Sequence, residues 1–200
     1  MSKPLILIDW YRTLSEHKFW ENHVSESALG IIQSELKNNL VFLNDWMRAK
    51  TSSEDVCEIL SAETQLSSKE LFSALQKSCE DISLSTAMVS ALSEVSRKAD
   101  LVLVSDNMDC FERWTLPNLK KLGVFSGFYL SSAIKRLKND NGGLTLAEAC
   151  RAYNINPQEA SLIDDSKPTR DIFESLGGRA HEVSNPADTE RTLKELLKSL

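Results

Sequence analysis

Two patterns of apolar residues divide the chain. Across residues 15–98, apolar side chains recur every three or four positions, for example at 28–36. This spacing is typical of amphipathic helices. Hydroxyl residues that precede acidic ones at 51–54 and 67–70 suit the first turn of a helix. The first pattern therefore predicts helix throughout this region.

Short apolar runs that alternate with helical stretches form the second pattern. We predict strands at residues 4–8, 101–104, 127–130, 160–163 and 180–183. Helices are expected at residues 86–98, 146–153, 169–176 and 188–200. Continuous Val, Ile and Leu runs between helices are typical of a parallel sheet that is covered on both faces. The sequence thus predicts a Rossmann-like α/β fold, a parallel sheet with helices on both faces.

The helical region follows the first predicted strand directly. We therefore assign residues 1–14 and 84–200 to an α/β core, and residues 15–83 to an all-helical subdomain inserted after that strand. A chain of 200 residues is long enough for one such core with an insertion.

Composition narrows the classes of function. Apolar residues make up 42% of the chain, which suits a packed core, and the net charge is −6. An acidic balance argues against nucleic acid or an anionic membrane surface as a partner, because both need basic surface. The apolar runs are too short to span a bilayer, and no secretory signal is visible. Four widely spaced cysteines without a C-x-x-C pair are typical of reduced thiols, so we expect a cytoplasmic protein.

Acidic and hydroxyl residues stand at the ends of three predicted strands. Asp9 follows the first strand, Ser105 and Asp106 follow the second, and Asp164 and Asp165 follow the fourth. Ligands of parallel sheets bind outside the carboxyl ends of the strands, so we expect these side chains to meet there. Crowded carboxylates repel one another without a cation, and Mg²⁺ is the natural candidate when the substrate carries phosphate.

Four segments together resemble the motifs of the haloacid dehalogenase (HAD) superfamily. Residues 9–14, Asp-Trp-Tyr-Arg-Thr-Leu, resemble its first motif, D-x-D-G-T-[LV]. Ser105, Lys138 and residues 162–166 resemble the second, third and fourth motifs in the same order. The segment 15–83 resembles the mobile helical cap of the family. The resemblance extends over nearly the whole chain.

The resemblance implies a nucleophile and a metal site. Asp9 would attack the substrate through its carboxylate, and it would bind Mg²⁺ together with the backbone carbonyl of Tyr11. Asp165 would be a direct metal ligand, and Asp164 would act directly or through water. The implied substrate is a small anionic, phosphorylated molecule.

The resemblance also implies residues that surround the nucleophile. Thr13 would orient Asp9, and Ser105 and Lys138 would bind the transferring group. Lys138 would in addition shield the charge on Asp9, and Asp106 is a further candidate for substrate binding. An aspartyl intermediate is covalent catalysis, and the charged clamp around it is electrostatic catalysis.

Tyr11 and Arg12 depart from the family motif. Phosphatases of the family have a second Asp where Tyr11 stands, and this Asp protonates the leaving alkoxide and later activates water. A phenol with a pKa of about 10 donates a proton but is a poor base at neutral pH, and losing a matched acid/base group costs roughly 10²–10⁴-fold in rate. We therefore expect Tyr11 to be a weak catalytic group and phosphatase activity to be low or limited to good leaving groups. Arg12 replaces the glycine of the motif, and it binds a substrate anion or points to solvent.

Three functions stay open at this point. A magnesium-dependent phosphatase-like hydrolase of low activity is favoured. A catalytically impaired relative that still binds phosphate and metal is the second. The third is a 2-haloacid dehalogenase, because those enzymes read D-x-Y-G-T and need no metal. The acids Asp164 and Asp165 argue against the third, since the dehalogenases have Ser/Asn-type residues there. The oligomeric state is left open.

Overall fold

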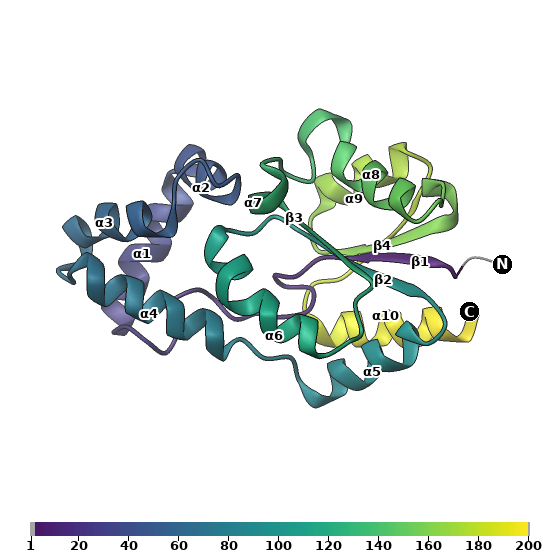
Figure 1. Cartoon of the computed structure of the whole chain (residues 1–200), viewed down its shortest axis with the longest axis horizontal. Helices are drawn as coiled ribbons and strands as arrows, with labels where there is room; N and C mark the ends of the chain where they lie inside the picture. Colours follow the sequence, from purple (N-terminus) through teal and green to yellow (C-terminus); the bar gives the residue numbers. More distant parts are fainter. Residues whose placement is uncertain (1–2, 200) are drawn as a thin grey trace.

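The computed structural model describes residues 3–199, and a five-stranded parallel sheet lies at its centre (Figure 1). The strands are β1 (Leu5–Ile8), β2 (Asp100–Ser105), β3 (Gly127–Leu130), β4 (Ala160–Asp164) and β5 (Arg179–Glu182). Their order in the sheet is β3-β2-β1-β4-β5, and every neighbouring pair is parallel. The predicted Rossmann-like parallel sheet is confirmed, and each predicted strand lies within one residue or so of an observed one.

Alternate residues of the strands face opposite layers of helices. In β1, Ile6 and Ile8 pack with α5 (Thr86–Ser96), α6 (Leu116–Lys121) and α10 (Pro186–Ser199). Leu5 and Leu7 pack with α8 (Leu144–Ala152) and α9 (Lys167–Ser175) on the other face. Figure 1 shows the two layers above and below the sheet. Burial on both faces explains why β1 is a continuous apolar run.

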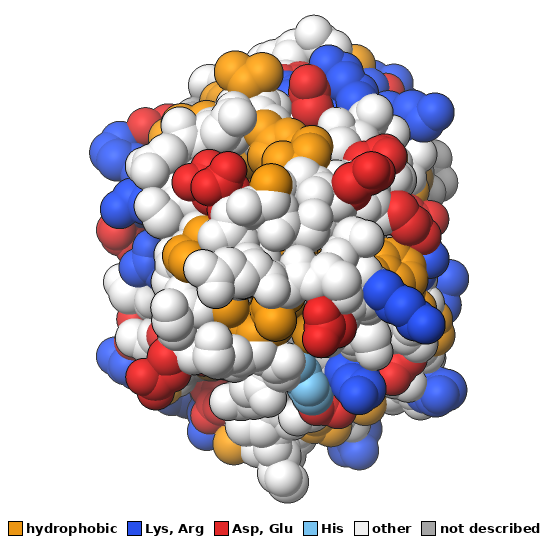
Figure 2. All heavy atoms as spheres, turned by 90° about the vertical axis from the view of Figure 1, so that its left-hand side faces the viewer, with side chains coloured by type: hydrophobic (Ala, Val, Ile, Leu, Met, Phe, Trp, Pro, Cys, Tyr) orange, Lys and Arg blue, Asp and Glu red, His pale blue; other side chains and the backbone are white. Residues whose placement is uncertain are grey.

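Four helices form a separate group at the end of the sheet to which the strands' carboxyl ends point (Figure 1). They are α1 (Glu26–Asn38), α2 (Leu40–Met47), α3 (Ser53–Thr64) and α4 (Ser68–Asp81). Ser52 and Ser67 cap α3 and α4 in reciprocal capping boxes, as the sequence predicted. We call residues 15–83 the helical insertion; these bounds, taken from the sequence, stay a prediction. Its outer face carries scattered hydrophobic side chains among polar and charged ones (Figure 2).

The prediction of helix throughout residues 15–98 is wrong for residues 15–25. This segment consists of turns, and Trp20 and Asn22 have φ angles of 65° and 64°, which end a right-handed helix. The indole Nε1 of the fully buried Trp20 donates to the carbonyl of Leu71, 2.8 Å away. The buried Trp20 side chain holds these turns in place. Its apolar character therefore indicates packing in the interior and not one face of a helix.

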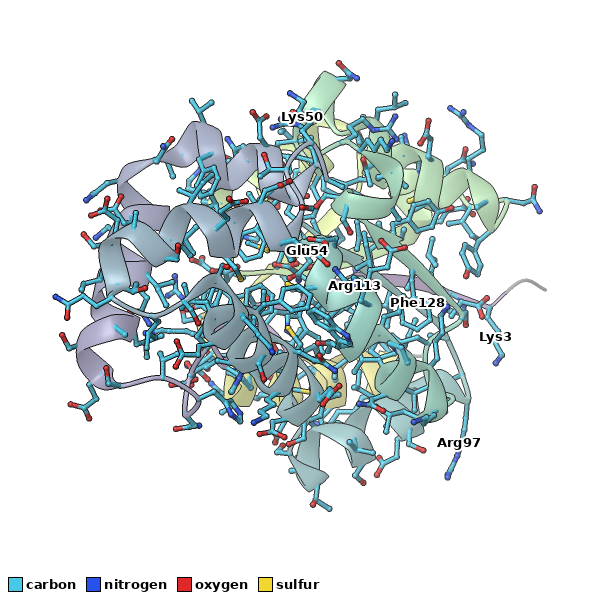
Figure 3. All side chains as sticks on the ribbon, turned by 60° about the vertical axis from the view of Figure 1, so that its left-hand side comes forward. Lys3, Lys50, Glu54, Arg97, Arg113 and Phe128 are labelled. Atoms are coloured by element: carbon cyan, nitrogen blue, oxygen red, sulfur yellow. The ribbon has the colours of Figure 1, made fainter. Side chains whose placement is uncertain are left out.

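A short π-helical turn, η1 (Phe111–Thr115), links the core to the helical insertion. Arg113 of η1 forms an ion pair with Glu54 of α3 at 2.8 Å, and Figure 3 shows the two side chains together. Thr115 donates to the carbonyl of Cys79 in α4 at 2.9 Å. The core residues Met108 and Cys110 also belong to the hydrophobic cluster of the insertion. Core and insertion therefore share a packed boundary.

No helix within residues 3–199 is both long and apolar enough to cross a bilayer. The four cysteines are buried, and none forms a disulfide.

Candidate functional site

Three carboxylates meet at the carboxyl edge of the sheet. Parallel pairing aligns Ile8 of β1 with Ile163 of β4, so Asp9 and Asp164 lie side by side beyond them. The amide of Asp9 donates to the carbonyl of Ile163 at 3.0 Å. One carboxylate oxygen from each of Asp9, Asp164 and Asp165 lies within 4.8 Å of the others. The sheet register itself thus brings these predicted residues together.

Lys138 lies between two of these carboxylates. Its Nζ atom is 2.9 Å from Asp9 Oδ1 and 2.7 Å from Asp164 Oδ2, and its side chain is 5% exposed. Burial alone would lower the pKa of Lys138, but the charges of Asp164 and Asp9 outweigh it and raise the pKa above its ordinary value. Lys138 is therefore a fixed cation against the predicted nucleophile.

The loop that carries Lys138 is held from two sides. Lys138 lies between α7 (Ser131–Ile134), which follows β3, and η2 (Asp140–Gly142). The amide of Lys138 donates to Asp106 Oδ1 at 2.8 Å. The carboxylate of Asp140 accepts from the amide of Leu137 at 2.9 Å and forms a bidentate ion pair with Arg48 at the end of α2. The helical insertion therefore contacts the lysine loop directly.

Asp164 and Asp165 differ in their surroundings. Asp164 is fully buried and accepts the amide of Ser166 at 2.8 Å, and burial raises its pKa to about 7. Asp165 is partly exposed, and its Oδ2 lies 3.4 Å from the guanidinium of Arg12. Burial, followed by the charge of Asp9, raises the pKa of Asp165. Burial is thus the main cause of both raised pKa values, and the charge of Asp9 adds to it, while Lys138 and Arg12 act in the opposite direction.

The donor set fits a hard divalent cation. Three carboxylates converge, while Lys138 and the half-exposed Arg12 contribute the neighbouring positive charges. Mg²⁺ takes oxygen ligands and is bound through one or two carboxylates plus substrate phosphate. That the backbone carbonyl of Tyr11 also binds the metal stays a prediction.

Ser105 ends β2 and Asp106 follows it at the same edge. Ser105 is 1% exposed, and its hydroxyl accepts from the side-chain amide of Asn107 at 3.1 Å. Ser131 holds the backbone of Asn107 in turn. The Ser131 hydroxyl accepts from the backbone amide of Asn107 at 2.9 Å and donates to its backbone carbonyl at 3.0 Å. One Asp106 oxygen is engaged by the amide of Lys138, and burial raises the pKa of Asp106. Asp106 thus supports the lysine loop, and its predicted role in substrate binding stays a prediction.

The loop after β1 departs from expectation at Thr13. The Trp10 carbonyl accepts from the amides of Leu14 and Ser15 at 2.7 and 3.1 Å, which closes a tight turn. Thr13 is fully buried, and within the described residues its hydroxyl has no hydrogen-bond partner. Among the described residues the Thr13 hydroxyl therefore forms no hydrogen bond to Asp9, and the orienting role of Thr13 stays a prediction.

The backbone at Arg12 has a φ angle of 59°, which lies in the left-handed region. This conformation suits glycine, the residue that the family motif has at this position. The side chain of Arg12 neither points freely to solvent nor stands alone, since it pairs with Asp165. Tyr11 is 42% exposed and lines a cavity of about 530 Å³ between this loop and the helical insertion.

Sequence reasoning missed Arg170. This residue of α9 is 8% exposed, and its Nη1 donates to the backbone carbonyls of Asp164 at 3.0 Å and Asp165 at 2.7 Å. It holds the peptide that carries both acids. Its position in the first turns of the helix after an acidic strand end is the signal that was available.

Comparisons with known proteins bear on the fold. Neither the models of known protein families nor the curated proteins include a match to the chain. A HAD-like family hydrolase structure from Porphyromonas gingivalis is 18% identical, with a TM-score of 0.72 over 99% of both chains. A HAD family enzyme of Bacteroides thetaiotaomicron in complex with magnesium and inorganic phosphate is 19% identical, with a TM-score of 0.68 over 90% of this chain and 93% of that one.

Dehalogenases have a similar structure as well. The 2-haloacid dehalogenase of Pseudomonas syringae is 12% identical, with a TM-score of 0.61 over 98% of this chain and all of that one. Because all these identities are low, the likeness establishes the fold. The chain has the fold of the HAD superfamily, which confirms the fold that the motifs predicted.

Proposed function

We propose that the protein is a magnesium-dependent hydrolase that takes the phosphoryl group of a phosphomonoester onto Asp9 and then releases it to water. The observation that carries the proposal is the position of the Asp9 carboxylate, between Lys138 and the acids that follow β4. Asp9 Oδ1 is paired with Lys138 at 2.9 Å. This ion pair holds the carboxylate in place for attack.

Each neighbour has a task in this mechanism. Asp9, Asp165 and Asp164 would hold Mg²⁺, which when bound supplies positive charge to the phosphoryl oxygens. Lys138 pairs with Asp9 and adds a second positive charge beside the transferring group. Ser105 is positioned by Asn107 to donate its hydroxyl proton to a phosphoryl oxygen. Arg170 and Asp106 act as positioning residues, because they hold backbone rather than substrate.

The first test removes the nucleophile and the metal. We expect p-nitrophenyl phosphate to be hydrolysed with Mg²⁺, and EDTA or Asp9→Asn to remove the turnover, because the amide is a very poor nucleophile. Phosphate release is measured. Asp45→Asn, which changes an exposed carboxylate of α2 away from the site, is the matched control and should leave the rate unchanged. Full turnover in EDTA or in Asp9→Asn would contradict the proposal.

Tyr11 favours one competing function. A dehalogenase needs no proton for its leaving halide, so a tyrosine two residues after the nucleophile is tolerable in that chemistry. The acids at positions 164 and 165 disfavour it, because with Asp9 they would repel an anionic haloacid. Metal-independent chloride release from 2-chloropropionate, without phosphate release in the first test, would favour the dehalogenase.

The missing acid/base group makes a separate prediction. We expect Tyr11→Asp to raise kcat for phosphate esters by roughly 10²-fold, since a carboxyl group both donates and accepts a proton near neutral pH. Tyr11→Asn is the matched control: it has the same size as the new side chain but does not titrate. If both variants change kcat equally, or if neither does, the tyrosine is not what limits the reaction.

A further inference from the structure

The cavity beside Tyr11 is placed to hold the part of the substrate that leaves. Tyr11, Asp106 and Asn107 are among the residues that line it. These residues directly follow the Asp9 and Ser105 strand ends, so a phosphoryl group at Asp9 would extend its ester oxygen toward this space. The volume of about 530 Å³ lies in the usual range for small-molecule sites.

The cavity walls are mainly apolar. The helical insertion contributes Phe19, Ile32, Leu36, Leu40, Leu43 and Met47 to the lining. Gln33 also lines it, as do the exposed side chains of Lys18 and Lys37. Leu40 is 61% exposed although it lines this cavity, so a bound apolar group would remove it from water.

These walls select against polyols. A sugar phosphate would bring several hydroxyl groups against the apolar side chains that make up most of the lining. Each buried and unpaired hydroxyl costs about 1–3 kcal/mol. An apolar group of similar size loses nothing of this kind and gains from burial. The lining therefore points to a substrate with an apolar body.

The chemistry at Tyr11 restricts the substrate further. An alkoxide must be protonated as it leaves, whereas an aryloxide leaves as a stable anion because phenols have a pKa of about 10. In the first step, an Asp9 oxygen bonds to phosphorus while the bond from phosphorus to the aryl oxygen breaks. The aryloxide departs with that electron pair and takes a proton from solvent. Water then attacks the aspartyl phosphate, releasing phosphate and Asp9, and gives its proton to solvent.

We infer that the substrates are aryl phosphomonoesters whose aromatic body occupies the cavity between Tyr11 and helices α1 and α2. This inference rests on the proposed function, because it assumes phosphoryl transfer to Asp9. It adds the chemical class of the leaving group and the surface that recognises it.

Three substrates separate the two halves of the inference. We expect 2-naphthyl phosphate to exceed glucose 6-phosphate by at least about 10²-fold in kcat/KM. 2-Naphthylmethyl phosphate has the same apolar body but leaves as an alkoxide, so it should keep a similar KM and lose about 10²-fold in kcat. Glucose 6-phosphate as the better substrate would overturn the inference, and equal kcat values for the two naphthyl esters would overturn its leaving-group half.

A charged residue in the cavity tests the binding surface. Leu36→Glu places a carboxylate in the lining and should weaken binding of 2-naphthylmethylphosphonate, a probe that is not hydrolysed, by at least about tenfold in Kd. Ile59→Glu is the matched control, because Ile59 is 52% exposed on α3 and does not line the cavity. Binding is measured by calorimetry in the absence of turnover. Equal Kd values in the two variants would overturn the inference.

The two levels of the proposal fail differently. If p-nitrophenyl phosphate is hydrolysed through Asp9 but the naphthyl probes show no preference, only the aryl inference is wrong. If no phosphate ester is turned over while Leu36→Glu still weakens the phosphonate, the cavity binds aryl groups and the proposed reaction is wrong.

Discussion

Arg12 has a backbone conformation that suits glycine and a side chain that contacts the acidic cluster. A left-handed conformation costs a residue other than glycine about 1–2 kcal/mol, and the φ angle of Arg12 is 59°. The guanidinium lies 3.4 Å from Asp165, one of the three carboxylates. A fixed positive charge at this distance competes with a cation for the same oxygen.

We expect Arg12→Gly to bind Mg²⁺ roughly fivefold to tenfold more tightly, because it removes a repulsion of about 1 kcal/mol at the edge of the site. Isothermal titration calorimetry measures the change. Lys135→Gly is the matched control, since Lys135 is exposed, has a φ angle of 55° and forms no ion pair with any residue in 3–199. An unchanged Kd in Arg12→Gly would show that the guanidinium does not oppose the metal.

Single residues also show where sequence reasoning succeeded and failed. Asp9 and Asp164 could be placed together because adjacent parallel strands end at one edge. The contact of Lys138 with both depended on the motif resemblance, since spacing alone does not place a loop. The sequence did not indicate that the Thr13 hydroxyl lacks a partner, and Arg170 was missed although it follows an acidic strand end. The hydroxyl of Thr13 depends on the exact turn, and Arg170 binds backbone carbonyls, which every sequence contains.

One carboxylate of the core, Asp109, contacts both α2 and α3. Asp109 accepts from Trp46 Nε1 at 2.9 Å, from Ser53 Oγ at 2.6 Å and from the Ser53 amide at 3.3 Å. Trp46 and Ser53 are both fully buried. Periodicity predicted the helices but not this contact, because an acidic residue next to an apolar segment looks like ordinary surface.

Asp109→Ala should therefore lower the free energy of unfolding by about 2–3 kcal/mol, since it leaves buried donors without their acceptor. Equilibrium urea denaturation gives the value. The comparison is Asp45→Ala, which removes an exposed ion pair with Lys50 and should change stability by less than about 1 kcal/mol. Similar losses in the two variants would show that Asp109 does not anchor the helices.

At the scale of the whole molecule, the helical insertion and the core share one packed boundary. Met108 and Cys110 complete the cluster around Trp20 and Trp46, and η1 contacts α4. The sequence pattern separated two regions by their period, and the boundary between them stays a prediction. It could not show that they share buried residues, because the contacts join positions far apart in the chain.

Shared burial predicts a single unfolding transition. In the double variant Trp10→Phe/Trp114→Phe, both tryptophans that are left, Trp20 and Trp46, lie in the helical insertion. We expect their fluorescence and the far-UV circular dichroism of the whole chain to change at the same urea concentration. Two separated midpoints would mean that the insertion unfolds independently of the core.

In the π-helical turn Phe111–Thr115, the number of residues matters more than which residues they are. Each residue advances an α-helix by about 100°, so deleting one residue here would rotate everything on one side of the turn relative to the other. Leu116 and Leu119 would lose their place under the sheet, or Arg113 would turn away from Glu54. A one-residue gap in a related chain would thus signal a differently oriented insertion, even where every hydrophobic residue is kept.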